Sequence, residues 1–235
     1  MPTNMKTIGP CVSMRAPRAR RPARAPSIVA TVATGVCFGF LATALFSPPA
    51  RAEAATTHLT ERVNFELESA SPDVRREADW VVESGDNRSM PFVIIDKAEA
   101  KVFVFYASGR LRGAARALLG LARGDLSVPG IGDRALSSIR PDERTTPAGR
   151  FVAALGRNLH GEEILWVDYD AAISLHRVIT SNVKEHRAQR LASSTSLDKR
   201  ITYGCINVSV VFYETVISPA FTGTDGIVYV LPEMN

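Results

Sequence analysis

Cysteine is scarce in this chain of 235 residues, which contains three. Cys11 and Cys37 lie in an N-terminal segment that we expect to be removed, so the mature chain would keep Cys205 alone. This scarcity excludes the network of disulfides that stabilises many small secreted domains. A solitary cysteine is in most proteins a small buried hydrophobic residue, and in some it is a nucleophile.

Acidic residues are absent from residues 1–52, which carry seven lysines and arginines. An arginine-rich stretch at residues 15–24 is followed by a 19-residue apolar run at residues 28–46 and by Ala50-Arg51-Ala52. This order is typical of an export signal that is cleaved after small residues. The apolar run is also nearly long enough to span a bilayer, so an uncleaved anchor is the alternative. We therefore expect an exported protein, in the periplasm or cell envelope, that contacts a membrane only through this leader if it is retained.

Positive charge is not in excess over the rest of the chain. Residues 53–235 contain 21 basic and 24 acidic residues, a net charge of −3, although the whole chain carries +4. A body of this charge lacks the basic surface on which nucleic-acid binding depends, so we expect no nucleic-acid partner. The glycines between residues 113 and 140 are not followed by Gly-Lys-Ser/Thr, so no phosphate-binding loop is indicated.

Residues 53–90 are predicted to form a linker and one short helix. Ser71 is a typical N-cap, Pro72 suits the first helical position, and Gly85 is a typical residue at which a helix ends. The polar composition of the preceding residues indicates no function for them.

Residues 91–233 are predicted to form one mainly β domain with one or two short helices. Two runs rich in β-branched and aromatic residues, 92–96 and 101–106, are joined by a short polar turn, which is typical of a β-hairpin. Further strands are expected after Gly109 and at residues 164–170, 171–176 and 227–231. Residues 113–140 are rich in glycine and are predicted to be a surface loop with one helical turn.

The stretch Thr202-Tyr203-Gly204-Cys205-Ile206-Asn207-Val208 places a thiol directly after a glycine and before a strand-like run. Because glycine lacks a Cβ, the backbone at Gly204 can adopt a strained turn and let a carbonyl group approach the neighbouring amide N–H groups. This arrangement would suit acyl transfer to Cys205.

This heptapeptide resembles the signature of the L,D-transpeptidases, bacterial cell-wall enzymes. The signature reads Ser/Thr-His-Gly-Cys, followed by an apolar residue and by Asn or Arg. Thr202, Gly204, Cys205, Ile206 and Asn207 match it, whereas Tyr203 replaces the histidine.

A second element, Thr145-Thr146-Pro147-Ala148-Gly149-Arg150-Phe151, resembles the Thr-Pro-x-Gly-x-Phe element of the same family. In the family this is a turn that leads into a strand beside the cleft. The resemblance implies a β-sandwich-like L,D-transpeptidase catalytic fold. It also implies that Thr146, Thr202 and Asn207 lie in the substrate cleft.

A cysteine needs a neighbouring base to become a thiolate at neutral pH, because its ordinary pKa is about 8.5. His58 and His160 lie in the linker and in a predicted turn, which leaves His176 and His186. The spacing between the histidine and the cysteine motif in the family favours His186. His176 ends an alternating strand, which would hold a catalytic group rigidly. We predict His176 as the base, with an insertion within residues 177–200, and keep His186 as the alternative.

The resemblance implies a cysteine-dependent L,D-transpeptidase that acts on peptidoglycan stem peptides. Cys205 would attack the amide after the diamino acid at stem position three and form a thioester, which an amine of a second stem peptide would resolve into a cross-link. His176 would exchange the protons. The backbone N–H groups of Tyr203, Gly204 and Cys205 would bind the oxyanion. The resemblance implies no metal and no organic cofactor.

Two other functions stay open. One is a peptidoglycan hydrolase, an L,D-carboxypeptidase or amidase, that passes the acyl group to water. The other is a non-catalytic wall-binding module with a degenerate site, because Tyr203 stands where the family has histidine.

Residues 177–200 carry six basic residues against two acidic ones, Glu185 and Asp198. We predict that this segment forms a lid over the cleft, in which Arg187 and Arg190 attract the carboxylates of stem peptides. A solvated basic surface without such a role is the alternative.

Overall fold

The computed structural model of this protein describes residues 63–233, so the predicted leader at residues 1–52 lies outside the described part. The described chain is mainly β, as predicted. Its strands are β1 (Phe92–Asp96), β2 (Lys101–Phe105), β3 (Leu111–Arg116), β4 (Leu119–Gly120), β5 (Gly149–Arg157), β6 (Glu163–Asp168), β7 (Ile173–Arg177), β8 (Arg200–Thr202), β9 (Ile206–Val208) and β10 (Gly226–Val230). Its α-helices are α1 (Pro72–Ser84), α2 (Arg187–Ala192), α3 (Val210–Phe212) and α4 (Ser218–Phe221), with a π-helical turn, Tyr213–Ile217, between the last two.

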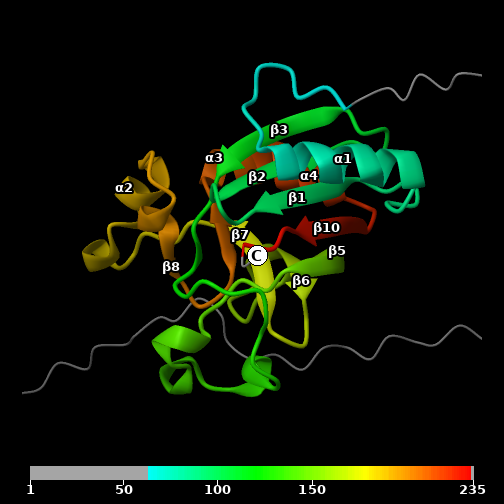
Figure 1. Ribbon diagram of the computed structural model, residues 1–235. Coiled ribbons are helices and arrows are strands. Elements are labelled where there is room, and N and C mark those ends of the chain that lie inside the picture. The colour runs from blue at the N-terminus through cyan, green and yellow to red at the C-terminus, as the bar shows by residue number, and fades with distance from the viewer. Residues whose placement is uncertain (1–62, 234–235) are drawn as a thin grey trace, which may run out of the picture. The chain divides into compact units, whose positions relative to one another are not determined.

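Helix α1 begins and ends at the residues that the sequence predicts. The Ser71 hydroxyl accepts a hydrogen bond from the Val74 N–H at 3.3 Å, and Gly85 adopts the left-handed conformation with φ +67°. The buried side of the helix carries Val74, Ala78 and Val81, which pack against the aromatic side chains of β1 and β2. Figure 1 shows α1 lying across this part of the sheet.

Eight strands form one sheet in the order β3-β2-β1-β10-β5-β6-β7-β9. The predicted hairpin is β1 paired antiparallel with β2, and β3 continues the meander. The closing strand, β10, inserts parallel to β1 and antiparallel to β5. At the far edge, β7 pairs with β9 in parallel, which brings residues 173–177 beside residues 206–208.

The sheet curves around one large hydrophobic core. Val93 of β1 and Leu165 of β6 belong to the same buried cluster, although β10 and β5 separate their strands in the sheet. Tyr213 and Phe221, from the helical segment that follows β9, fill the same core. Helix α1 covers the opposite face of β1 and β2, so the arrangement is sandwich-like with an added helical layer.

The prediction of a surface loop over residues 113–140 is wrong for its first part. Residues 113–116 belong to β3, residues 117–119 are fully buried, and β4 pairs with β8. Gly120 is needed there for close packing, since a Cβ on it would lie 2.4 Å from the Arg144 carbonyl oxygen. Glycine in this stretch therefore reflects contact between backbones as well as turns.

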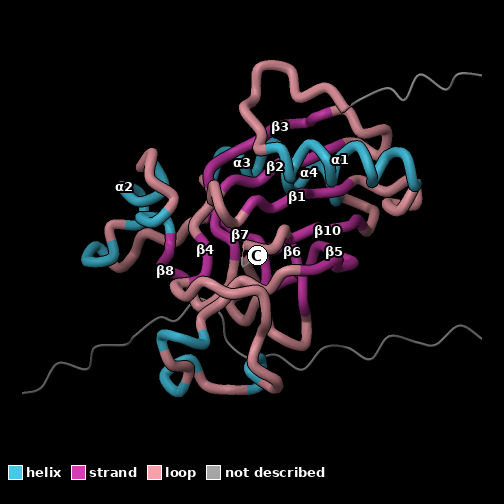
Figure 2. The backbone as a smooth tube through the Cα atoms, in the orientation of Figure 1, coloured by secondary structure: helices cyan, strands magenta, loops and turns pink. Residues whose placement is uncertain are grey.

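The rest of that stretch and the segment after β7 are irregular. Residues 131–144 contain three short 3₁₀ turns, Ile131–Asp133, Leu136–Ser138 and Pro141–Glu143. Residues 178–199 carry α2 and project to one side of the sheet, while the 3₁₀ turns extend from its lower edge (Figure 2). No helix within residues 63–233 has the length and apolar character that crossing a membrane requires.

Candidate functional site

The residues that match the cysteine motif form a tight turn between β8 and β9, which we call the Cys205 turn (Thr202–Cys205). The Thr202 hydroxyl donates to the Cys205 carbonyl oxygen at 2.7 Å and accepts from the Gly204 N–H at 3.1 Å. Thr202 is buried, so these two bonds stabilise the turn from within. The structure therefore places Thr202, which was predicted to lie in the substrate cleft, beneath the Cys205 turn. The Gly204 N–H, which we predicted to bind an oxyanion, donates to a protein atom instead.

Position 204 can only be occupied by glycine without strain. Its φ is +131°, and a Cβ on it would lie 2.6 Å from both the Thr145 carbonyl oxygen and Ile173 Cδ1. The Thr146 hydroxyl donates to the Gly204 carbonyl oxygen at 2.8 Å and accepts from the Gly120 N–H at 2.9 Å. The two sequence elements that resemble the family are thus in direct contact, and fully buried Thr146 supports the turn from below.

The backbone at Thr146 is itself held by a buried lysine that the sequence analysis did not single out. Lys97 is fully buried, and its ammonium group donates to the Thr146 carbonyl oxygen at 2.9 Å and to the Asp125 carboxylate at 2.5 Å. Glu233 lies 3.8 Å from the same ammonium group and forms an ion pair with Arg200. This buried ionic cluster connects the Thr146 turn, β8 and the C-terminal segment, so it positions the site without lining it.

The sulfur of Cys205 lies against β7. Its residue is 3% exposed, and Sγ is 3.6 Å from the Ser174 hydroxyl oxygen and 3.7 Å from the Ala172 carbonyl oxygen. In this structure the sulfur is disulfide-bonded, so nucleophilic chemistry belongs to the reduced chain, in which a thiolate can form. Ser174 was not among the predicted site residues, although the period-two alternation of a strand puts it on the same face as His176.

His176 lies two residues after Ser174 on β7 and pairs with Asn207 of β9. Its Nδ1 is 2.8 Å from the Arg177 carbonyl oxygen, which can only accept, so Nδ1 carries the proton. Nε2 then accepts from the Asn207 side-chain amide at 3.0 Å. Burial lowers the pKa of His176 to about 4, and the positive charges of Arg187 and Arg177 act in the same direction. At neutral pH the imidazole is therefore uncharged, with both nitrogens engaged.

Asn207 connects His176 to the basic segment of residues 177–200. Its side-chain oxygen accepts from Arg187 Nη1 at 2.8 Å, while Arg187 Nε donates to Glu185. Arg187 is 4% exposed, so its charge faces the protein interior. Arg190 donates to the backbone carbonyl oxygens of Glu185 and Asp198, at 3.0 and 2.9 Å.

The structure thus sorts the predicted site residues into groups. Thr202, Gly204 and Thr146 build the Cys205 turn, and His176, Asn207 and Arg187 form a buried hydrogen-bonded row beside it. His186 and Arg190 lie outside both groups. His186 is exposed and has φ +50° at the N-terminal end of α2.

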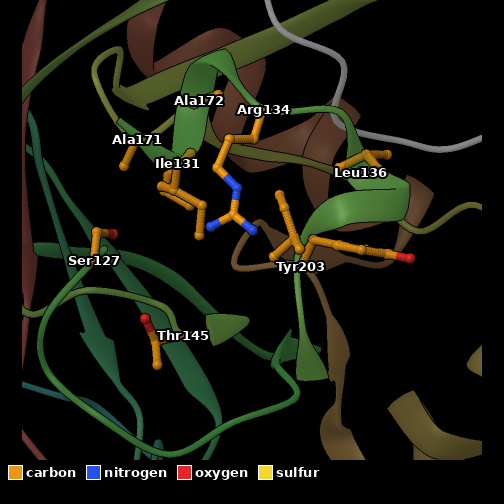
Figure 3. Close-up of a pocket in the computed structure, with 11 residues that line it drawn as sticks. Ser127, Ile131, Arg134, Leu136, Thr145, Ala171, Ala172 and Tyr203 are labelled. Carbon is orange, nitrogen blue, oxygen red and sulfur yellow. The ribbon is translucent and has the colours of Figure 1, made fainter. Parts of the chain in front are cut away.

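Tyr203 lines a small pocket with Thr145, Ala172 and Ile173. Figure 3 shows the Arg134 side chain extending toward the centre of this pocket, between Ile131 and Tyr203. The guanidinium of Arg144 lies over the Tyr203 ring, 4.0 Å from its centroid. Within residues 63–233, no group of three or more His, Cys, Asp and Glu side chains is arranged to hold a metal ion.

Comparisons with known proteins find similarity at the level of structure. No protein-family model matches the chain, and no curated protein sequence matches it. One similar structure is a cysteine-to-serine mutant of Enterococcus faecium L,D-transpeptidase, with 13% identity and a TM-score of 0.32, covering 60% of this chain and 50% of that chain. Another is the catalytic domain of E. faecium L,D-transpeptidase solved by NMR, with 14% identity and a TM-score of 0.30, covering 61% of this chain and 98% of that chain.

This chain therefore spans half the length of the first of these two proteins. No residue role follows from these similarities. Both similar structures are L,D-transpeptidases, the family that the Cys205 turn and the Thr146 element resemble in sequence.

Proposed function

We propose that the reduced chain is a cysteine-dependent L,D-transpeptidase that acts on peptidoglycan stem peptides. The observation that carries this proposal is the interlocking of the two sequence elements at the Cys205 turn. The Thr202 and Thr146 hydroxyls hold the backbone of Gly204, and Cys205 directly precedes strand β9 of the sheet. At φ +131° Gly204 holds a backbone conformation that other residues rarely adopt, and such positions are frequent at functional sites.

In the proposed reaction the Cys205 thiolate adds to the carbonyl carbon of the amide that follows the diamino acid at stem position three. The C–N bond breaks, the departing D-alanine amine takes up a proton, and a thioester remains on the sulfur. The amine of a second stem peptide then attacks the thioester carbonyl and loses a proton, and the thiolate leaves. The Tyr203 and Cys205 backbone N–H groups are the oxyanion donors in this proposal, because the Gly204 N–H is engaged by Thr202.

His176 stays the proposed base, and Ser174 is proposed to orient the sulfur. The imidazole is uncharged and lies on the same strand face as Ser174, which supports a role near the sulfur. Its Nε2 accepts from Asn207 in this structure, so taking the thiol proton would require the Asn207 amide to release it. His186, which is exposed, is the alternative base.

One observation favours a second candidate, a non-catalytic wall-binding module. Both nitrogens of the His176 imidazole are engaged, by the Arg177 carbonyl oxygen and by the Asn207 amide, so neither is directed at the sulfur. A chain with this site and no turnover would still bind stem peptides. In either case we propose that the protein is exported and works in the periplasm or cell envelope, with a membrane contact only through its leader.

The test is exchange of the terminal residue of a purified muropeptide by the reduced protein. We expect wild type to exchange it and Cys205→Ser to fold but to lose the activity, because a serine hydroxyl is a far poorer nucleophile at neutral pH. His176→Ala should abolish thiol acylation, and the matched variant His186→Ala should leave most of it. Turnover by Cys205→Ser would overturn the cysteine mechanism, and release of acid without exchange would favour the hydrolase.

A further inference from the structure

Arg144 presents an incompletely used guanidinium beside the Cys205 turn. Its Nε and Nη2 donate to one acceptor, the Ile139 carbonyl oxygen, at 3.3 and 3.0 Å. A guanidinium has five N–H donors, so most of them remain available. Both Arg144 and Tyr203 are half-buried, so each member of the stacked pair keeps contact with solvent.

The charge of Arg144 is not neutralised by the residues around it. In the same segment, residues 131–144, Arg134 makes a two-point ion pair with Glu143 at 3.0 and 3.1 Å, and Arg140 pairs with Asp142 at 2.9 Å. No acidic side chain in the described chain forms an ion pair with Arg144. Of these three arginines, Arg144 alone has no acidic partner among the described residues.

The position of Arg144 is tied to the reacting centre through the backbone. The next residue, Thr145, presents its carbonyl oxygen to Gly204, 2.6 Å from where a Cβ would lie. Tyr203 precedes the sulfur-bearing residue by two positions. The pocket that Tyr203 lines also includes Ala172, whose carbonyl oxygen is 3.7 Å from the sulfur (Figure 3). Arg144 stacks on Tyr203, and Tyr203 and Ala172 line the same pocket, so the guanidinium lies two contacts away from the residue beside the sulfur.

We propose that Arg144, supported by the Tyr203 ring, binds the free C-terminal carboxylate of the donor peptide, the group that departs with the terminal residue. This inference rests on the proposed function. A planar guanidinium binds a carboxylate through two parallel hydrogen bonds, and stacking on an aromatic ring holds it in place for that contact. Tyr203 supplies a flat face for this stacking where the family has histidine, so the departure from the motif gains a role in substrate selection.

The other cationic side chains near the site do not meet this requirement. Arg187 is buried and bound to Asn207 and Glu185, and Arg190 donates to backbone carbonyl oxygens of its own segment. Arg134 reaches the pocket but shares its charge with Glu143. A carboxylate next to the scissile amide therefore finds its best partner in Arg144.

The experiment measures binding by isothermal titration calorimetry to the reduced full chain carrying Cys205→Ala, which cannot react. The probes are a synthetic stem tetrapeptide with a free terminal carboxylate and the same peptide as its C-terminal amide. We expect the acid to bind about tenfold or more tightly than the amide, as expected for a charge-assisted hydrogen-bonded pair. Adding Arg144→Gln should reduce this ratio to about one, and Arg144→Lys should restore part of it because a charge without the planar fork remains.

Arg140→Gln is the matched control, because Arg140 lies in the same segment and is exposed and paired with Asp142. It should leave the acid-to-amide ratio unchanged. The inference is overturned if the Cys205→Ala chain binds acid and amide equally, if it binds neither, or if Arg144→Gln and Arg144→Lys both keep the preference. Unfolding curves of both variants confirm that the chain is folded in each titration.

Turnover of the same two peptides by the chain with Cys205 intact separates this inference from the proposed function. An Arg144-dependent preference in binding without turnover would support the subsite and contradict the transpeptidase. Turnover with an acid preference that survives Arg144→Gln would support the transpeptidase and contradict the subsite.

Discussion

Two arginine-bearing segments flank the Cys205 turn, and they use their charges in opposite ways. Residues 177–200 carry the larger excess of positive charge, yet Arg187 is buried on Asn207 and Arg190 holds backbone carbonyl oxygens. Residues 131–144 contain as many acidic as basic residues, yet Arg144 stays without an ion pair within the described chain. Charge counted along a sequence window therefore does not locate the charge that a ligand can meet.

Among the changes that test this comparison, we expect Arg187→Met to have the largest effect on the free energy of unfolding. The change removes a charge-assisted hydrogen bond and leaves the buried oxygen of Asn207 without its donor, which together should lower the free energy of unfolding by about 4 kcal/mol. The matched change Arg190→Met should cost less than about 1 kcal/mol, because its carbonyl acceptors can turn to water. Urea denaturation measures both, and equal losses would mean that the segment carries no special buried contact.

The next effect concerns the pH dependence of stability through His176. Its pKa is about 4 in the folded chain and about 6.5 when unfolded. Because the folded pKa is the lower one, the buried neutral imidazole does not weaken the fold above pH 6.5. As pH falls from about 6.5 to about 4, protons bind the unfolded chain first, and stability should fall by about 3 kcal/mol.

Unfolding measured at several pH values in wild type and His176→Gln checks this. The variant should show a smaller loss over the same range, whatever its stability at pH 7. Parallel curves would show that another group is responsible for the pH dependence.

The smallest effect, on turnover, is expected from substitutions of Tyr203, whose ring lies against the Arg144 guanidinium. Tyr203→Phe keeps the ring under the guanidinium and the backbone N–H, so we expect turnover within about twofold of wild type. Tyr203→His restores the residue of the family and should also be active, with some change in the choice of acceptor. The two variants are compared with wild type on one muropeptide substrate. An inert wild type and an active Tyr203→His would identify the natural protein as a binding module.

The elements of local origin could be predicted from the sequence. Ser71 and Gly85 mark the ends of α1 because capping depends on a few neighbouring residues. The 92–96 and 101–105 strands pair as a hairpin because their turn is short. The family resemblance implied that Thr146 and Thr202 lie in one cleft, and the structure brings their two elements into contact through Gly204.

The contacts that depend on pairing across the sheet could not be predicted. Ser174 lies beside the sulfur because β7 and β9 pair in parallel in a register that places His176 opposite Asn207. A shift of one residue would turn both side chains to the other face. Lys97 follows a strand and has the sequence context of an exposed turn residue, and only the tertiary fold buries it among acidic groups.

The central claim is that Cys205 is a nucleophile which forms a thioester, and acylation by a carbapenem tests it most directly, because the thiols of the L,D-transpeptidase family are acylated by these compounds. The reduced full chain is incubated with the compound, its intact mass is measured, and peptide mapping assigns the adduct. The proposal predicts one adduct on Cys205 that Cys205→Ala lacks. An unmodified wild-type chain, or an equal adduct in Cys205→Ala, would contradict it.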